Sequence, residues 1–235
     1  MTAGWAIKQI ALPLSLDRQF SFDNFFGEQT NLLVGSLQAL VTGQGEPQIG
    51  IHGVSGSGKT HLLNACAHYA RNQQIRFHLY DGLQLKALEA SEFEGFEQCD
   101  VLAIDNLDAI AGDRAWEALF YQIINRCRDG EYRFVFTLSG LPGFLDLKLE
   151  DLRSRLQWGL LLEAPVSDDE AIRDILKKRA QLMGIELSAE VISYLLTHHS
   201  RNLSAQMAIL RTLDGASLSQ RRKVTIPLIK QALAH

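Results

Sequence analysis

The amino-acid sequence predicts an α/β protein: a parallel sheet between two layers of helices, followed by a small all-α subdomain. Short apolar runs alternate with segments of helical periodicity over most of the chain, which is typical of a parallel sheet. A glycine-rich phosphate-binding motif stands between the first apolar run and the helix that follows it. Beyond Pro165 the strand signals end and only helical patterns remain.

Length and composition fit an ordinary globular protein. The 235 residues suffice for one large α/β domain with a smaller companion, since domains usually span about 100 to 200 residues. Hydrophobic residues make up 46% of the chain and charged residues 21%, a balance that excludes wholesale disorder. A net charge of −4 gives no overall electrostatic reason to bind nucleic acid. We therefore expect no direct sequence-specific DNA binding, although a local basic patch remains open.

The cysteines and the hydropathy pattern indicate an intracellular protein. Cys66, Cys99 and Cys127 are odd in number, widely spaced and without a CxxC pair, so we expect reduced thiols. No run of 18 apolar residues exists, and residues 1–9 lack the apolar stretch of a signal peptide. The expected location is the cytoplasm, with no membrane association.

Three parts are predicted along the chain. Residues 1–21 contain Pro13 and little helical periodicity, which predicts an extended arm. Residues 22–165 are expected to form the α/β nucleotide-binding domain, and residues 166–235 the helical subdomain.

The elements of the α/β part follow from its apolar patterns. A helix at residues 28–41 precedes the first strand and ends at Gly43. The alternation that follows predicts strands at residues 48–52, 76–80, 101–104, 133–138 and 160–162, with helices at residues 59–71, 83–90 and 115–127. Because the strands are continuous apolar runs, we expect them to be buried on both faces.

The first helix of the helical subdomain is predicted to begin at Ser167, where three carboxylates follow near the positive end of the helix dipole. Ser188 marks a second helix start in the same way. Further helices are predicted at residues 203–221 and 226–234, the latter introduced by Thr225 and a proline in its first turn.

The segment from Gly53 to Thr60 reads Gly-Val-Ser-Gly-Ser-Gly-Lys-Thr and fits the P-loop pattern GxxxxGK[ST] in full. Its glycines allow backbone N–H groups to close around phosphate oxygens, while Lys59 reaches the terminal phosphates and Thr60 binds magnesium. A chance glycine-rich turn is the alternative, at about one per hundred chains of this length. The predicted nucleotide-binding residues are Gly53, Ser55, Gly56, Ser57, Gly58, Lys59, Thr60 and His61, with ADP or ATP and Mg²⁺ as expected ligands.

A second signal follows the third predicted strand. Asp105 ends the apolar run and is expected to hold Mg²⁺ beside Thr60, although without the P-loop it would only be an aspartate that ends a strand. Asn106 stands where many P-loop ATPases carry a carboxylate that polarises the attacking water. Since an amide cannot accept a proton, we expect slow hydrolysis. Asp108 is at the wrong offset to be a simple substitute.

Arg153 and Arg155 lie just before the last predicted strand. The planar guanidinium group can stabilise a transferring phosphoryl group across an interface, but spacing alone equally allows two surface arginines on a short helix. The pair His198-His199 and the basic run at residues 221–223 are interpreted as packed or solvated side chains, without a site.

Four groups of motifs occur in order along the chain: Phe22-Asp23-Asn24-Phe25 with Gly27 and Asn31; residues 58–63; Ile104-Asp105-Asn106 with Ile110-Ala111-Gly112; and Ser154-Arg155-Leu156 with Trp158-Gly159. Together they resemble the AAA+ core of the bacterial replication initiator family DnaA, and most of all its DnaA-related regulators. The resemblance covers nearly the whole chain. It implies a P-loop AAA+ fold, a three-layer parallel sheet whose C-terminal all-α subdomain is a lid.

Two features distinguish this sequence from an initiator. It ends at His235, directly after the predicted lid, so we expect no C-terminal DNA-binding helix-turn-helix domain. The arm also carries a hexapeptide similar to the peptide with which many proteins bind the bacterial sliding clamp. Taken alone this signal is weak, and a packed or disordered arm would explain it. The predicted clamp-binding residues are Gln9, Ile10, Leu12, Pro13 and Leu14.

The resemblance also implies roles for residues around the nucleotide. The base is expected near Phe22 and Phe25, between the sheet and the lid. Arg155 is expected to act as an arginine finger in trans, on ATP held by the initiator. Ser139 falls in the sensor 1 region, where a polar side chain orients water. The sensor 2 arginine of the family would fall at about Ser204, and Arg201 or Arg211 is a candidate substitute.

The function expected from the resemblance is negative regulation of replication initiation. The protein, bound to the DNA polymerase sliding clamp, would stimulate ATP hydrolysis by the initiator DnaA, and it would form homodimers or larger homo-oligomers. Two alternatives stay open. One is an autonomous ATPase that loads or remodels a replication protein, against which Asn106 argues. The other is a small-molecule P-loop kinase, for which the sequence offers no acceptor pocket.

Overall fold

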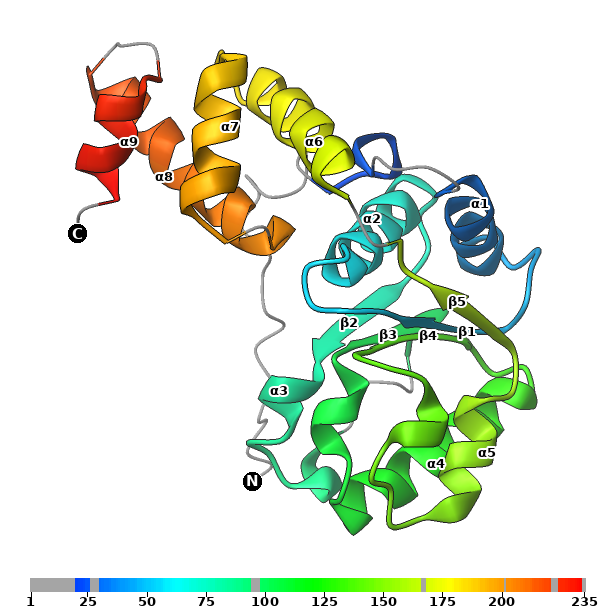
Figure 1. Ribbon diagram of the computed structural model, residues 1–235. Helices are drawn as coiled ribbons and strands as arrows, with labels where there is room; N and C mark the ends of the chain where they lie inside the picture. Colours follow the sequence, from blue (N-terminus) through cyan, green and yellow to red (C-terminus); the bar gives the residue numbers. More distant parts are fainter. Residues whose placement is uncertain are drawn as a thin grey trace, which may run out of the picture.

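Five parallel strands form the sheet at the centre of the described protein (Figure 1). The computed structural model describes residues 20–25, 30–93, 98–165, 168–200, 202–220 and 224–233, so nearly all of the predicted arm, residues 1–21, lies outside it. The strands are β1 (Gln48–His52), β2 (Phe77–Asp81), β3 (Val101–Asp105), β4 (Arg133–Leu138) and β5 (Leu160–Glu163). Their order across the sheet is β2-β3-β4-β1-β5, and every neighbouring pair is parallel.

The strand bounds agree closely with those predicted from the apolar runs. β1 and β4 begin and end where expected, β2 lies one residue later, and β3 and β5 each extend one residue further. β3 is buried at every position, and β1 and β4 at all but one. The predicted burial on both faces is thus confirmed for these three central strands, which helices cover on both sides. It is wrong for β2 and β5, which are only partly buried because they form the edges of the sheet.

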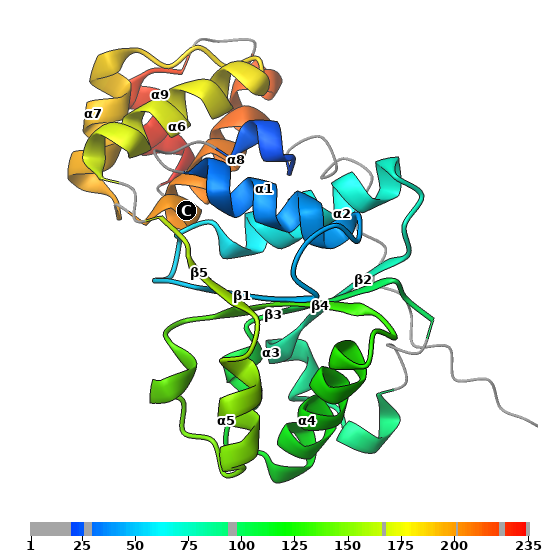
Figure 2. The same ribbon diagram turned by 90° about the vertical axis from the view of Figure 1, so that its right-hand side faces the viewer.

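Two helices cover one face of the sheet, α1 (Thr30–Val41) and α2 (Lys59–Asn72) (Figure 2). They pack on β1 and its neighbours through a fully apolar cluster that includes Leu37, Leu40, Ile49, Ile51, Leu62, Leu63 and Cys66. Both helices were predicted, with α2 one residue longer than expected. The packing holds the start of α2 directly behind the end of β1.

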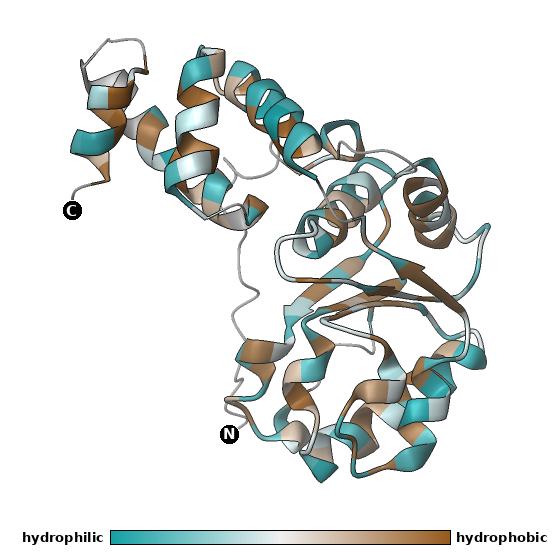
Figure 3. Ribbon diagram, viewed as in Figure 1, coloured by the Kyte–Doolittle hydropathy of each residue, from teal (hydrophilic) through white to brown (hydrophobic). Residues whose placement is uncertain are grey.

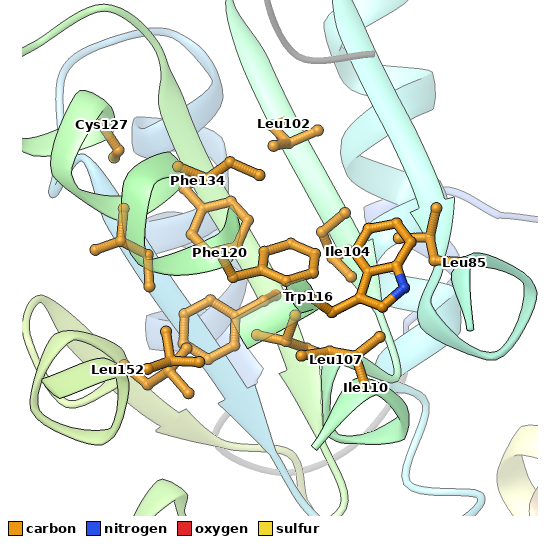
Figure 4. Packing of buried hydrophobic residues seen from close by; sticks show 14 of the residues in the cluster. Leu85, Leu102, Ile104, Leu107, Ile110, Trp116, Phe120, Cys127, Phe134 and Leu152 are labelled. Atoms are coloured by element: carbon orange, nitrogen blue, oxygen red, sulfur yellow. The ribbon is translucent and has the colours of Figure 1, made fainter. Parts of the chain in front are cut away.

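The opposite face carries α4 (Arg114–Arg128) and α5 (Glu150–Leu156), which lie side by side below the sheet in Figure 2. Aromatic rings dominate this core: Phe120 stacks on Phe134 at 6.4 Å between centroids, and Phe134 on Phe136 at 5.3 Å. Leu152 brings α5 into the same cluster (Figure 4). The apolar colouring of the strands and of the helix faces toward them matches this layered burial (Figure 3).

The helix predicted at residues 83–90 is wrong over most of its length. Only α3 (Gly82–Leu85) is helical, and the chain then turns into a 3-10 segment, Ala90–Glu92. Leu85 and Phe93 are both buried in the α4 cluster, whereas Leu88 is exposed. The indole Nε1 of Trp116 donates to the Leu88 carbonyl at 3.3 Å. The N–H groups of Ala87 and Leu88 bond to the carbonyls three residues earlier, those of Gln84 and Leu85, so the α-helix closes in tighter turns at this point.

Four helices form the lid and share their own apolar cluster: α6 (Asp169–Leu182), α7 (Ala189–His198), α8 (Leu203–Gln220) and α9 (Ile226–Ala232). Three side chains cap these helices: Ser188 and Thr225 at the predicted starts, and Asp168 one residue after the predicted start at Ser167. Asp168 accepts from Ala171 N, Ser188 from Val191 N and Thr225 from Leu228 N. Each cap satisfies a backbone donor that has no partner within its helix.

The three cysteines are buried free thiols, as predicted for reduced core residues. Within the described part of the chain, no helix is both long and apolar enough to span a bilayer. Nor do the described His, Cys, Asp and Glu side chains form a group of three that could hold a metal by themselves.

One buried carboxylate connects the loops on the α4 side. Glu117 is 0% exposed and accepts from the backbone N–H groups of Gly112 at 2.8 Å, Lys148 at 3.2 Å and Leu149 at 2.7 Å. It therefore joins α4 to the turn before it and to the segment that leads into α5. Removing it would leave these part-buried donors without their acceptor.

We expect Glu117→Ala to lower the free energy of unfolding by about 3 kcal/mol, because three backbone N–H groups lose their acceptor together and a fully buried side chain is removed. Urea unfolding measures this change. The matched variant Glu150→Ala removes a carboxylate that is 88% exposed on α5, and it should change stability by less than about 0.5 kcal/mol. Equal losses in the two variants would contradict the assigned role of Glu117.

Candidate nucleotide-binding site

The carboxyl ends of β1, β3 and β4 meet at one edge of the sheet, because β4 pairs in parallel with both other strands. Gly53 follows β1, Asp105 ends β3 and Ser139 follows β4. Residues far apart in sequence are thereby gathered at the edge where ligands bind in open parallel sheets.

The P-loop runs from the end of β1 into α2. Gly58 caps α2 with φ +90, and a Cβ there would meet the Phe25 ring at 2.7 Å. Both the backbone conformation and the close ring therefore require glycine. The first N–H groups of the 14-residue helix α2 face away from the helix body, at its positive end. This is the geometry of an anion cradle.

Lys59 occupies the interior of this loop. Its ammonium donates to the Gly53 carbonyl at 2.6 Å and to the Val54 carbonyl at 2.9 Å. Burial lowers the pKa of Lys59, while the nearby carboxylates of Asp105 and Asp108 act in the opposite direction. The charge is thus held at the centre of the loop by carbonyl oxygens.

Asp105 is buried behind Thr60. Thr60 Oγ1 donates to Asp105 Oδ2 at 2.6 Å, and Thr137 Oγ1 donates to Asp105 Oδ1 at 2.5 Å. The pairing of Thr60 with Asp105 is the one the motifs predict. Thr137 was not predicted, because its role depends on the neighbouring strand β4 and no motif marks it.

Two further polar contacts surround this pair. Asn106 adopts the left-handed conformation, with φ 52, and its amide donates to Asp81 Oδ1 at 3.0 Å. Ser139 Oγ donates to Asp108 Oδ2 at 2.5 Å. The offset of Asp108 had set it aside, yet the structure places its carboxylate against Ser139 and close enough to influence Lys59. A 3-10 turn, Leu107–Ile110, produces this placement.

A cavity of about 810 Å³ opens between the sheet edge and the lid. The cavity is lined by the P-loop, by the segment before α1, by residues that follow β3 and β4, and by the helices α6 and α8. The lining residues include Phe20, Asn24, Phe25, Ser55, Gly56, Ser57, Gly58, Lys59, Thr60, His61, Asn106, Ser139, Arg179, Met183, Leu203, Met207, Arg211 and Asp214. The cavity is large enough for a small-molecule ligand.

One wall of the cavity is aromatic. Phe25 stacks on His61 with ring centroids 5.6 Å apart, and Phe20 lies 5.2 Å from the same ring. Phe22, which was predicted to lie at the base, does not line the cavity and instead packs edge-on against Tyr69 at 5.8 Å. Phe22 belongs to the 3-10 helix Phe22–Asn24 and its ring contacts α2, whereas Phe20 lines the cavity.

His61 connects three segments of the protein. Arg179 Nη2 lies 2.8 Å from His61 Nδ1, and His61 Nε2 lies 3.0 Å from the Ser21 carbonyl. Because a guanidinium can only donate, Nδ1 is the acceptor and Nε2 carries the proton. Burial lowers the pKa of His61 to about 4; the bond to Ser21 opposes this change and the charge of Arg179 adds to it.

The lid contacts the P-loop directly. Asn202 Nδ2 donates to the Ser55 carbonyl at 2.9 Å, and its Oδ1 accepts from Ala205 N at the start of α8. Arg179 of α6 and Arg211 of α8 both face the cavity. Burial lowers the pKa of Arg179, with a further contribution from the charge of Arg211. Of the two candidate sensor 2 substitutes, Arg211 is therefore at the cavity, and Arg201 lies outside the described residues.

Besides Phe22, two groups of predicted residues are not part of this cavity. Arg155 lies on α5, on the far face of the sheet, with its guanidinium 5.5 Å from the centroid of the Tyr121 ring. Gln9, Ile10, Leu12, Pro13 and Leu14 lie outside the described residues. The remaining predicted residues gather around the P-loop, where Gly53 contributes its carbonyl and Asp105 supports Thr60 from behind.

The histidine contacts make the stability of the protein depend on pH. Below about pH 6.5 the unfolded chain binds a proton at residue 61, whereas the folded protein keeps the ring neutral down to about pH 4. The contribution of His61 to the free energy of unfolding is therefore fully present above about pH 6.5 and is lost as the pH drops toward 4. On going from pH 7 to pH 5, urea unfolding should show wild type losing about 2 kcal/mol more than His61→Gln. An identical pH dependence for the two proteins would contradict the buried, neutral ring.

Comparison with known proteins identifies relatives over the whole chain. Residues 16–163 match the family "Bacterial DnaA ATPase domain", and residues 168–233 match the family "Hda, lid domain". A protein of Haemophilus influenzae described as uncharacterized is 32% identical over 228 residues, which cover 96% of this chain and 98% of that protein.

Solved structures share the fold at low identity. Domain III of the replication initiation protein DnaA from Thermotoga maritima has a TM-score of 0.76 at 20% identity and covers 92% of this chain and 96% of its own. AMPPCP-bound DnaA from Aquifex aeolicus has a TM-score of 0.68 at 23% identity, with 86% and 69% covered. A RuvB variant from Thermotoga maritima has a TM-score of 0.67 at 20% identity, with 93% and 72% covered. These likenesses establish an AAA+ fold with a C-terminal helical lid. Since the DnaA ATPase-domain family matches well over half of the sequence and the Hda lid family most of the rest, the chain belongs to the Hda/DnaA-like family of AAA+ proteins.

Proposed function

We propose that the protein binds ADP or ATP with Mg²⁺ in the cavity between the sheet edge and the lid. The P-loop backbone and the positive end of α2 would hold the phosphates, and Lys59 would exchange its loop carbonyls for phosphate oxygens. Phe25 and Phe20 would flank the base, on the wall they form with His61. The AMPPCP complex of the Aquifex aeolicus DnaA supports this assignment, because the nucleotide analogue there belongs to a chain of the same fold.

The residues at the cavity floor suit a magnesium ion. Mg²⁺ prefers oxygen ligands and usually keeps several waters beside one or two protein groups and the phosphates. Thr60 Oγ1 at the start of α2 and Asp105 Oδ2 at the end of β3 lie 2.6 Å apart and provide such oxygens. Thr60 would bind the ion directly and Asp105 would hold its water shell. The bound ion would neutralise charge on the phosphates.

We propose further that the protein regulates the replication initiator DnaA rather than acting mainly on its own nucleotide. Arg155 carries this proposal, because it lies on α5, away from the cavity of its own chain, and cannot serve there. A partly exposed guanidinium on that face can reach a nucleotide held by a neighbouring subunit. The membership in the Hda/DnaA-like family supports DnaA as that neighbour.

In this proposal the hexapeptide at residues 9–14 tethers the protein to the DNA polymerase sliding clamp. Clamp-bound protein would stimulate ATP hydrolysis by the initiator and so inhibit a second initiation. Residues 22–165 would serve as the nucleotide-binding domain and residues 166–235 as the lid. Homodimers or larger assemblies would use the same face that carries Arg155.

A second candidate function is an autonomous ATPase that loads or remodels a replication protein. Asp108 favours it, since this carboxylate accepts from Ser139 near the phosphate end of the cavity. Asn106 opposes it, because its amide cannot accept a proton and is already bonded to Asp81. Rapid ATP turnover by the isolated protein would favour this candidate over the regulator.

The regulatory proposal predicts the effect of removing the guanidinium. In a mixture of ATP-loaded initiator, clamp and DNA, Arg155→Ala should reduce stimulation of hydrolysis by roughly a thousandfold, the scale typical of arginine fingers. The rate of phosphate release measures this stimulation. Arg153→Ala is the matched control, because Arg153 lies on the same helix but donates to the Leu145 carbonyl of its own chain. It should retain most of the stimulation.

A variant with Gln9, Leu12 and Leu14 changed to Ala separates tethering from chemistry. It should lose clamp binding and stimulation together while keeping nucleotide binding. Full stimulation by Arg155→Ala would eliminate the finger mechanism, and full clamp binding by the triple variant would eliminate the tether.

A further inference from the structure

The guanidinium of Arg155 is held against a second helix. It lies over the ring of Tyr121 on α4, 5.5 Å from the ring centroid. Arg155, followed by Asn125 one turn further along α4, lowers the pKa of the Tyr121 hydroxyl. The contact with the ring face restricts a side chain that would otherwise sample many rotamers.

The backbone at Arg155 is fixed independently. The buried Gln48 of β1 donates from Nε2 to the carbonyls of Arg155 and Trp158. Gly159 packs so closely on Gln48 that an added Cβ would lie 2.5 Å from the Gln48 carbonyl oxygen. The end of α5 is thereby attached to the strand that leads into the P-loop.

The two helices are also held in register beneath the sheet. Phe120, the neighbour of Tyr121, and Leu152 of α5 belong to the same buried cluster (Figure 4). Glu117, one turn before Tyr121 on α4, binds the backbone that leads into α5. Tyr121 therefore presents its ring at a fixed place relative to Arg155.

A competing partner is available to Arg155. Asp151 lies four residues earlier on α5, the spacing at which opposite charges pair on a helix. The described ion pairs do not include one between these two residues; Arg155 is directed to Tyr121 instead. Asp151 is nevertheless near enough to act electrostatically on the Tyr121 hydroxyl. Without the tyrosine, the guanidinium would be free to turn back to Asp151.

We propose that Tyr121 is a positioning residue that holds Arg155 extended for its action on a nucleotide in a neighbouring subunit. The proposal rests on the proposed function of Arg155. It assigns to Tyr121 no contact with the nucleotide, only control of where the guanidinium points. Any effect of Tyr121 on ATP hydrolysis must therefore depend on Arg155. Variants of the two residues, alone and combined, can test this dependence.

Stimulation of initiator ATP hydrolysis by the full-length protein provides the first test. We expect Tyr121→Leu to lower it about tenfold and Tyr121→Phe, which keeps the ring face, two- to threefold. Adding Tyr121→Leu to Arg155→Ala should cause no further loss, because the two residues form one unit. The control Gln122→Leu, at the next and exposed position of α4, should match wild type.

Direct observation of the contact provides a second test that needs no partner protein. Arg155, followed by Asn125, lowers the pKa of the Tyr121 hydroxyl, with Asp151 opposing. Burial raises the pKa of Tyr80 and Tyr132. NMR titration of tyrosine labelled at ¹³Cζ, assigned with Tyr121→Phe, should find Tyr121 ionising before those two. Arg155→Gln should move its midpoint upward.

The outcomes separate the possible failures. An unchanged Tyr121 midpoint in Arg155→Gln overturns the proposal, as does full stimulation by both tyrosine variants when Arg155→Ala has lost it. An additive loss in the double variant also overturns it, because the tyrosine would then act by another route. Full stimulation by Arg155→Ala removes the proposed function itself and the positioning role with it.

Discussion

A buried ammonium group costs free energy unless oxygen atoms surround it, and the site depends on how Lys59 meets this constraint. The loop between β1 and α2 supplies the Gly53 and Val54 carbonyls, and two carboxylates lie further out. The positive charge is therefore preorganised at a helix N-terminus, where phosphate oxygens can replace the carbonyls. The rest of the fold fixes the position of the loop between β1 and α2 and brings the other polar groups of the site close to it.

The sheet order explains how those groups arrive. Since β4 lies between β1 and β3, Thr137 can bind Asp105 from one side while Thr60 binds it from the other. Two separate apolar cores fix the helices on the two faces, so α2 and α5 end up on opposite sides of the sheet. The same architecture therefore places the P-loop in one location and Arg155 in another. This separation is the physical basis for proposing an action on a neighbouring subunit.

Much of this arrangement follows from local sequence patterns. Continuous apolar runs predicted every strand to within a residue, and the P-loop and Asp105 were identifiable because their chemistry requires a fixed local spacing. The partners that complete the site were not identifiable in this way. Thr137, Asp81 and Arg179 act through tertiary contacts, and nothing in their own neighbourhood marks them.

The errors have the same origin. Phe22 and Phe20 are two residues apart, and only the turn of a short 3-10 helix decides which ring faces the cavity. Asp108 was set aside because of its offset, yet the chain leaves β3 through a left-handed Asn106 and a tight turn that bring its carboxylate to Ser139. The helix predicted at residues 83–90 ends at Leu85, where the backbone bonds shorten to three-residue turns. In each case a short, tight turn that the apolar pattern does not mark sets the course of the chain.

Calorimetric titration of the purified protein with ADP and with ATP, in the presence and absence of Mg²⁺, tests the role of Lys59 most directly. The account predicts saturable binding by wild type that is strengthened by magnesium, and loss of that binding in Lys59→Ala, which retains the backbone of the loop. Absence of nucleotide binding by wild type, or equal binding by Lys59→Ala, would contradict it.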